Sequence, residues 1–405
     1  MKNIISCLLL LLCTSVYGQK GDPAKVVKKG FDFAAQQLTL ALNETEQAQI
    51  LAAPERTNKR PLVSPRTLNS DGSLQLTTAD DWTSGFFPGE LWLMYEYTGD
   101  PKWEKAARLH TDPLEREKLT RNTHDMGFKM YCSFGNGYRL TKDENYKNIL
   151  LQSAYTLITR YHPKVKAIRS WDFNRDRWQF PVIIDNMMNL ELLFWAFKES
   201  GDSTFYRIAV DHANTTLKNH FRADNSSYHV ISYDTITGQV EKRNTYQGYA
   251  DESAWARGQA WGAYGFTMCY RETKNPDYLK QAEKIVKFIF TNPNLPKDLI
   301  PYWDYNDPKI PSAPRDVSAA ACLASALYEL SSYDKKKGVQ YKKWANAIIN
   351  NLTDHYRATP GQDRGFLLLH SVGAKPFNIE VDVPIVYADY YYLEALLRKR
   401  QSANQ

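Results

Sequence analysis

Two aspartates each stand at the start of an apolar stretch that reads as a buried helix. Asp185 lies in 180–196, FPVIIDNMMNLELLFWA, and Asp125 lies in 123–128, THDMGF, sixty residues earlier. A helix that is hydrophobic all round is a buried helix, so both carboxyl groups are expected to face an interior or the floor of a cleft. Each Asp could also simply cap its helix, which stabilises a protein by about 1 kcal/mol. Two carboxyl groups in the same setting favour acid/base chemistry on a sugar or a similar polyol.

A third segment combines aromatic and polar residues more densely than any other part of the chain. It ends at Trp261 and reads YQGYADESAWARGQAW. The spacing of Trp255, Arg257 and Trp261 lets the arginine point towards a cleft while Trp261 lies one turn deeper. An arginine near a helix N-terminus opposes the helix dipole, and an anion held between them would offset that cost. The alternative is that Arg257 pairs with Asp251 or Glu252 and that the tryptophans pack.

A repeated sequence motif, called a turn phrase below, indicates the helices that must position these residues. In four places an apolar helix ends, an Asp or Asn follows, and an aromatic residue three positions later starts an amphipathic helix. Such phrases are typical of short turns between antiparallel helices. The four phrases are 98–103, 141–146, 200–205 and 273–278, and a looser copy spans 331–341.

Hydrophobic periodicity around these turns predicts about twelve helices. The even-numbered helices are the more apolar, so they are expected to form an inner ring. The chain is therefore predicted to be all-α, an (α/α)6 toroid of six helical hairpins that forms one catalytic domain over 19–405. The helices are expected near 24–42, 84–98, 101–110, 124–140, 144–161, 185–199, 203–220, 253–272, 277–291, 316–332, 338–357 and 382–399.

This geometry gathers the N-termini of the inner helices at one rim. Converging N-termini present unpaired N–H groups and positive dipole ends, which favour an anionic ligand. A long connection at 221–252 predicts a short hairpin or lid there, whereas 53–78 reads as a loop. The rim is expected to collect Trp82, His124, Asp125, Asp185, Ser253, Arg257, Asp316 and Asp382.

The first residues predict export. Lys2 precedes a short apolar core, and Gly18 ends a stretch suited to cleavage, so residues 1–18 read as a signal peptide. The core is too short to span a bilayer, so membrane insertion is not expected. Cys13 follows Leu12 rather than a small residue, which favours a periplasmic protein over a lipoprotein. Removal of Lys2 lowers the formal charge from +6 to +5, and the chain has no basic run typical of nucleic-acid binders.

The cysteine and histidine pattern offers no framework for disulfides or metals. Cys132, Cys269 and Cys322 remain after the signal, each in an apolar context, as is typical of small buried hydrophobic residues. The histidines are isolated from one another, and neither HExxH nor CxxC occurs. No metal site is therefore predicted, and a monomer or weak oligomer is expected.

Four motifs together resemble glycoside hydrolase family 88, the unsaturated glucuronyl hydrolases. They are HDMGF, FPVIIDNMMNLELLFWA, QGYADESAWARGQAWGAYG and DYYYLEALLR, spread over about 78–398. The resemblance implies an (α/α)6 toroid without a metal or an organic cofactor. It also implies that the enzyme removes a 4,5-unsaturated uronic acid from the non-reducing end of oligosaccharides left by polysaccharide lyases, with sulfated substrates possible.

The resemblance also assigns site residues. Asp185 matches the general acid/base and Asp125 the second essential carboxylate of the family, and His124 beside it is counted with the substrate site. The chemistry implied is hydration of a vinyl ether, for which burial must keep Asp185 protonated against the helix dipole. The residues matched to sugar contacts are the aromatic Trp82, Trp171, Trp255 and Trp261 and the polar His229, Gln247 and Arg257.

The chain departs from the family near 369–384, where the serine pattern for the next sugar does not align. Lys375 in this segment is predicted to contact a sulfate group. Two other functions stay open. One is unsaturated rhamnogalacturonyl hydrolysis of pectin fragments, although DNMMN at 185–189 favours the glucuronyl type; the other is non-catalytic glycan binding, for which exposed tryptophans would suffice.

Overall fold

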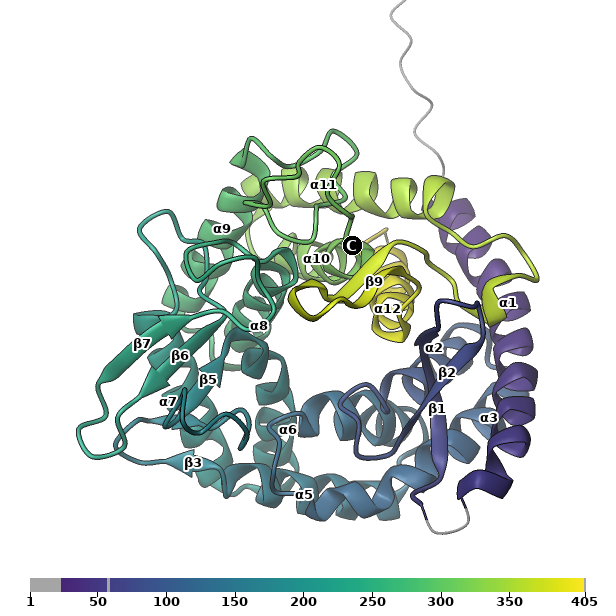
Figure 1. Ribbon diagram of the computed structural model, residues 1–405, viewed down its shortest axis with the longest axis horizontal. Coiled ribbons are helices and arrows are strands. Elements are labelled where there is room, and N and C mark those ends of the chain that lie inside the picture. The colour runs from purple at the N-terminus through teal and green to yellow at the C-terminus, as the bar shows by residue number, and fades with distance from the viewer. Residues whose placement is uncertain (1–22, 57–58, 404–405) are drawn as a thin grey trace, which may run out of the picture.

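The helices form two concentric rings in the computed structural model, which describes residues 23–56 and 59–403 (Figure 1). The inner ring consists of α2 (Phe86–Thr98), a π-helix (Gly127–Gly135) continued by α4 (Asn136–Thr141), α6 (Leu190–Ser200), α8 (Ala256–Thr273), α10 (Val317–Leu330) and α12 (Val386–Ala403). The outer ring consists of α1 (Pro23–Ala52), α3 (Pro101–Thr111), α5 (Glu144–Ile158), α7 (Ser203–Asn219), α9 (Pro276–Thr291) and α11 (Lys335–His355).

The predicted (α/α)6 toroid is confirmed, with the more apolar helices inside. Helix α12 contacts both α10 and α2, which closes the inner ring. In the part of the chain that the structure describes, no helix is both long and apolar enough to cross a bilayer. The predicted signal peptide lies outside the described residues.

The repeated turn phrases position the outer helices as predicted. Asp100, Asp143, Asp202 and Asn275 each accept a hydrogen bond from the backbone N–H two residues later and so cap the next helix. Asp334 does the same for α11 in the looser copy. A side-chain cap satisfies an otherwise unpaired helix N–H. The aromatic residue that follows each of the first four caps is buried and anchors its helix to the core.

Three helix boundaries differ from the prediction. The first helix continues to Ala52 rather than ending near 42. The last begins at Val386, because Asp382 has a positive φ of 60° and belongs to a strand that pairs with the chain before it. The inner helix that was expected from 185 starts as a 3₁₀ turn, Ile184–Asn189, before α6.

Short antiparallel sheets surround the mouth of the ring. The hairpin predicted in 221–252 is confirmed as β6 (Val230–Tyr233) and β7 (Val240–Asn244), and β5 (Pro181–Ile183) adds a third strand to it. The loop reading of 53–78 was wrong. The other strands are β1 (Leu62–Leu68) with β2 (Leu74–Thr78), β3 (Tyr161–His162) with β4 (Ala167–Ile168), and β8 (Ser371–Ala374) with β9 (Ile379–Val383).

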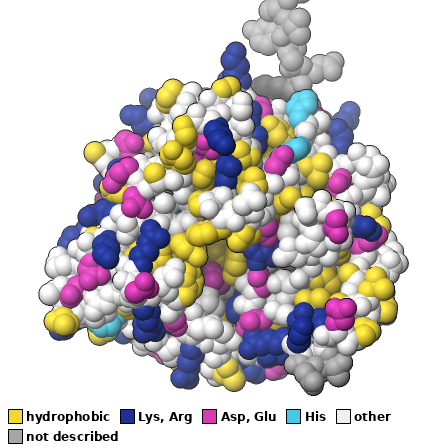
Figure 2. Space-filling view, in the orientation of Figure 1, with side chains coloured by type: hydrophobic (Ala, Val, Ile, Leu, Met, Phe, Trp, Pro, Cys, Tyr) yellow, Lys and Arg dark blue, Asp and Glu magenta, His cyan; other side chains and the backbone are white. Residues whose placement is uncertain are grey.

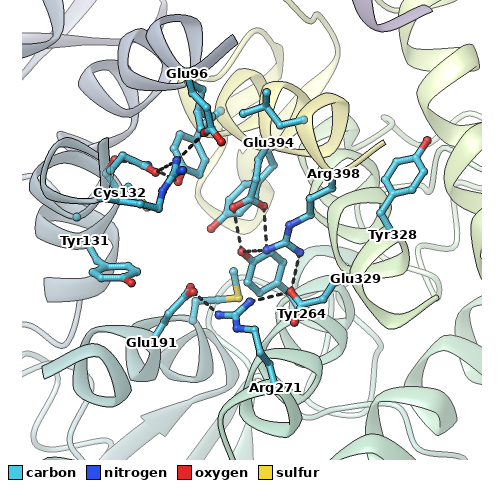
Figure 3. Close-up of a pocket in the computed structure, with 18 of the residues that line it drawn as sticks. Glu96, Tyr131, Cys132, Glu191, Tyr264, Arg271, Tyr328, Glu329, Glu394 and Arg398 are labelled. Carbon is cyan, nitrogen blue, oxygen red and sulfur yellow. Dashed lines mark hydrogen bonds and ion pairs between the residues drawn. The ribbon is translucent and has the colours of Figure 1, made fainter. Parts of the chain in front are cut away.

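Ion pairs brace the opposite, C-terminal end of the inner helices, around a cavity of about 420 Å³ (Figure 3). Arg271 of α8 pairs with Glu191 of α6 and with Glu329 of α10, the latter at 2.9 Å. Arg398 of α12 lies 3.0 Å from Glu329 and 3.8 Å from Glu394. The network therefore ties four inner helices together.

Replacing Arg271 by Met should destabilise the ring without affecting catalysis at the other end. The change leaves Glu191 without its cation, and removing one partner of a partly buried ion pair costs about 1–3 kcal/mol. Calorimetry should show a fall in Tm of several degrees, with kcat/KM unchanged. Arg207→Met is the control, because this exposed arginine lies 4.0 Å from Asp211 and forms no closer ion pair with a described residue. Equal losses of Tm in both variants would contradict the bracing role.

Candidate active site

The two predicted aspartates lie at the N-terminal starts of neighbouring inner helices. The backbones of these starts meet at Gly127, where a Cβ atom would stand only 2.6 Å from the Cα of Asn189. The N–H of Phe128 donates to Asn189 Oδ1 at 3.1 Å. Gly127 and Asn189 therefore fix the segment of Asp125 against the segment of Asp185.

Asp185 is buried and does not cap its helix. It lies inside the first turn of the 3₁₀ segment, whose capping position is Ile183, and its Oδ2 atom has no hydrogen-bond partner in the protein. The capping interpretation of Asp185 was therefore wrong. A buried polar atom without a partner is costly, so the unpaired Oδ2 marks a place where a substrate or water binds.

Burial raises the pKa of Asp185 to about 7, from an ordinary value of 3.8. The negative charge of Asp125 raises it further, whereas the Arg257 cation, the Asp185 backbone N–H and the Trp261 indole lower it. Removal of a carboxyl from water disfavours its charged form, and here this effect outweighs the lowering interactions. Asp185 can therefore hold a proton near neutral pH, as the sequence led us to expect.

The strand pairing in front of Asp185 brings His229 to it. Strands β5 and β6 pair so that the N–H of Ile184 donates to the carbonyl of His229 at 3.1 Å. His229 Nδ1 accepts backbone hydrogen bonds from Tyr246 and Gln247 at 3.0 and 3.1 Å. An Nδ1 that accepts two bonds places the ring proton on Nε2, and Nε2 lies 3.7 Å from Asp185 Oδ2. Burial keeps the pKa of His229 well below its ordinary value, so it presents a neutral N–H donor.

Asp125 is held by its own sequence neighbours. Thr123 Oγ1 donates to Asp125 Oδ2 at 2.5 Å, and His124 Nε2 lies 3.2 Å from Asp125 Oδ1. Burial lowers the pKa of His124, against the opposing charge of Asp125. His124 is thus a buried group that orients the second carboxyl rather than a free base.

The four predicted tryptophans differ in exposure. Trp82 is partly exposed and borders the cleft. Trp171 is mostly buried, with an indole N–H that has no partner. Trp255 is buried between His229, at 4.8 Å between ring centres, and the Arg257 guanidinium, at 4.5 Å, so it packs the site together. Trp261 is fully buried beneath Asp185.

Arg257 is buried and holds the hairpin formed by β8 and β9 over the site. Its Nη1 atom donates to Asp316 at 3.2 Å and also to the carbonyl of Val372, and Nη2 donates to the carbonyl of Gly373 at 2.7 Å. The alternative that Arg257 pairs with Asp251 or Glu252 is wrong. Asp316 lies at the rim as expected, where it caps α10.

A cleft of about 250 Å³ opens between this hairpin and the ring. The mouth lies at the centre of the face in Figure 2, where hydrophobic side chains border the hollow. Gln247 lines the cleft and donates to the carbonyl of Gly373 at 3.3 Å. The other residues that line it are Arg66, Trp82, Tyr246, Arg257, Gly373, Ala374, Phe377, Ile379, Glu380 and Tyr387.

Several of these residues were not predicted from the sequence. Arg66 lies on β1, which was read as loop, and it pairs with Asp81 and with Glu380 of β9 at 2.5 Å each. Tyr387 carries a buried hydroxyl group without a partner. Lys375 is not among the residues that line the cleft, and its ammonium lies 5.9 Å from the ring centre of Trp303. Its predicted sulfate contact stays a prediction.

Unpaired buried atoms distinguish this mouth from the cavity at the other end of the ring. They include Asp185 Oδ2, His229 Nε2, Trp171 Nε1 and the Tyr387 hydroxyl, whereas no described residue that lines the opposite cavity has one. Among residues 23–56 and 59–403, no cluster of three or more His, Cys, Asp and Glu side chains could hold a metal ion. The unpaired atoms at the mouth suit a ligand with polar groups.

Comparison with known proteins identifies the family of the chain. Residues 57–273 match the model of Glycosyl Hydrolase Family 88. The unsaturated glucuronyl hydrolase of Formosa agariphila is 56% identical over 322 residues, 79% of this chain and 80% of the relative.

Two solved structures share the fold along almost their whole length. The structure of an unsaturated glucuronyl hydrolase specific for heparin is 47% identical, with a TM-score of 0.87 over 94% of this chain and 98% of that one. A variant of the Streptococcus agalactiae unsaturated glucuronyl hydrolase in complex with dGlcA-GalNAc6S is 28% identical, with a TM-score of 0.75 over 93% and 92% of the two chains. The chain, in which Asp125 and Asp185 start neighbouring inner helices, therefore belongs to Glycosyl Hydrolase Family 88. It is a glycoside hydrolase.

Proposed function

We propose that the protein removes 4,5-unsaturated glucuronic acid from the non-reducing end of lyase-generated glycosaminoglycan oligosaccharides. The observation that carries this proposal is the buried carboxyl of Asp185. Its pKa is raised to about 7, and its Oδ2 atom has no hydrogen-bond partner in the protein. Such a group is suited to donate a proton at neutral pH. The sequence relatives named unsaturated glucuronyl hydrolases support the same activity.

The C4–C5 double bond of the substrate is a vinyl ether. Asp185 gives its proton to C4, and positive charge develops over C5 and the ring oxygen. Water then adds to C5 and returns a proton to the Asp185 carboxylate, which restores the acid. The resulting hemiketal opens at the C5–O5 bond and gives a ketone at C5 and a hemiacetal at C1. The hemiacetal then breaks its bond to the glycosidic oxygen, so C1 becomes an aldehyde and the rest of the oligosaccharide leaves as an alcohol. Because the anomeric carbon is not attacked directly, the carboxyl spacing that separates retaining from inverting glycosidases does not apply.

The neighbours of Asp185 support each charge state in turn. The Asp125 charge favours the protonated acid before the transfer. After the transfer the new carboxylate faces the N–H of His229, 3.7 Å away, and the Arg257 cation. His229 cannot take the proton itself at neutral pH, because its pKa is far below 7. Asp185 is thus assigned both the acid and the base step.

A heparin-type, sulfated substrate is the finer part of the proposal. It is supported by the 47% identical structure, which is described as specific for heparin. Relative rates on sulfated and unsulfated unsaturated disaccharides test it, and equal rates throughout would count against it. Activity on unsaturated rhamnogalacturonyl substrates alone would favour the pectin alternative instead.

Export is a further proposal, and it depends only on the sequence of residues 1–18. Cleavage after Gly18 would leave Gln19 at the mature N-terminus. N-terminal sequencing of protein recovered from the periplasm should begin at Gln19, and a protein retained with Met1 in the cytoplasm would contradict export.

Asp185→Asn should nearly abolish turnover while leaving substrate binding intact. The amide keeps the size of the side chain but carries no transferable proton, and acid/base groups typically contribute about 10²–10⁴-fold to a rate. Stopped assays that follow loss of the conjugated ultraviolet band should show this fall in kcat, with substrate binding still detectable by calorimetry. Asp277→Asn, on the surface of α9, is the matched control and should be unchanged. Substantial kcat in Asp185→Asn would exclude Asp185 as the proton donor.

Activity should fall as pH rises through about 7, because kcat/KM follows the protonated form of Asp185 in the free enzyme.

Folding stability should respond to pH in the same direction as activity. The folded state holds the proton more tightly than the unfolded chain, so this contribution to stability is lost as pH rises from about 4 to 7. Asp185→Asn should therefore gain Tm relative to the wild type at pH 8 more than at pH 5. A gain that is the same at both pH values would contradict the raised pKa.

A further inference from the structure

A strip of aromatic rings leads outward from the proposed acid to the surface. The Trp171 ring lies 6.3 Å from His229, and His229 lies 3.7 Å from Asp185. Trp171 stacks on Phe173 at 4.8 Å between ring centres, with 15° between the planes. Tyr246 lies 5.6 Å from both of these rings. The strip thus begins beside the reacting sugar and continues away from it.

The hairpin formed by β8 and β9, called the lid hairpin below, completes the strip from the other side of the cleft. Phe377 lies between β8 and β9, and its ring centre is 4.7 Å from that of Tyr246. Tyr246 therefore contacts both Phe173 and Phe377, and these two rings come from segments two hundred residues apart in the chain. Both Tyr246 and Phe377 also line the cleft.

The outer rings are unusually exposed for aromatic side chains. Phe173 is 46% exposed and Phe377 is 45% exposed, and Ile379 of the same hairpin is 49% exposed. Trp171, at the inner end, is only 8% exposed. Clustered apolar side chains at a surface mark binding sites, and this cluster shares Tyr246, Phe377 and Ile379 with the lining of the cleft. Its occupant is therefore part of the same substrate.

We propose that Phe173 and Phe377 bind the sugar residue that follows the leaving residue, so that the enzyme prefers unsaturated tetrasaccharides to disaccharides. The proposal rests on the proposed function. The unsaturated uronic acid lies at Asp185 and the leaving residue beside Trp171, which places the next pyranose at the two outer rings. Their apolar faces suit the C–H face of a pyranose ring rather than a sulfate or carboxylate group.

The test compares kcat/KM on an unsaturated disaccharide and on a tetrasaccharide that carries the same terminal disaccharide. The wild type should prefer the tetrasaccharide. Phe173→Ala should lower kcat/KM on the tetrasaccharide about threefold to tenfold, through KM, and leave the disaccharide within twofold. Phe377→Ala removes a ring that also lines the cleft, so it should lower kcat/KM on both substrates, and more on the tetrasaccharide. Phe377→Tyr keeps the ring and should retain the preference. Tyr155→Ala is the control, because this 44% exposed ring lies on α5, outside the cleft.

Three outcomes would overturn the proposal. Equal wild-type kcat/KM on both lengths would exclude the additional sugar site and leave the proposed function intact. If Phe173→Ala lowered kcat/KM equally on the disaccharide and the tetrasaccharide, the Phe173 ring would act on the reacting sugars instead. Absence of turnover on either substrate by the wild type would remove the proposed function and the additional site together.

Discussion

Removal of the Asp185 carboxyl from water is the constraint on which the rest of the site depends. Desolvation is the largest cause of its raised pKa, and it exceeds the lowering effect of Arg257 nearby. The ring supplies this burial, since Asp185 is buried with Arg257 and Trp261 of α8, His229 and Asp125 around its carboxyl. A proton donor for a carbon atom needs such an environment, because an exposed aspartate would be ionised at neutral pH.

Arg257 shows how the structure limits the opposing charge. Its guanidinium pairs with Asp316 and with the carbonyls of Val372 and Gly373. The cation that would otherwise keep Asp185 ionised thus serves to hold the lid hairpin in place. Arg66 secures the other strand of that hairpin through Glu380. The same two arginines line the cleft, so lid position and cleft polarity are set together.

The ring and the two acids could be predicted because their signals are local. Helix caps such as Asp100 and Asp143, together with the 3.6-residue hydrophobic periodicity, define where a helix starts and which face it buries. Both signals come from residues that are close together in the sequence. Several of the errors involve distant partners. Arg257 bonds to Asp316, 59 positions away, and the start of the last helix is displaced because Asp382 joins a strand. The β1–β2 hairpin is equally non-local in origin, since it is held by α12 and by Glu380 across the fold.

The most direct test of the central claim compares two glucuronides that differ only in the C4–C5 double bond. Both carry the same chromogenic leaving group, and its release is followed with the wild-type enzyme near pH 6, where Asp185 is protonated. The unsaturated compound should be cleaved and the saturated one should be inert, because Asp185 then has no alkene carbon to protonate. Cleavage of both at comparable rates would contradict hydration and would indicate ordinary displacement at the anomeric carbon.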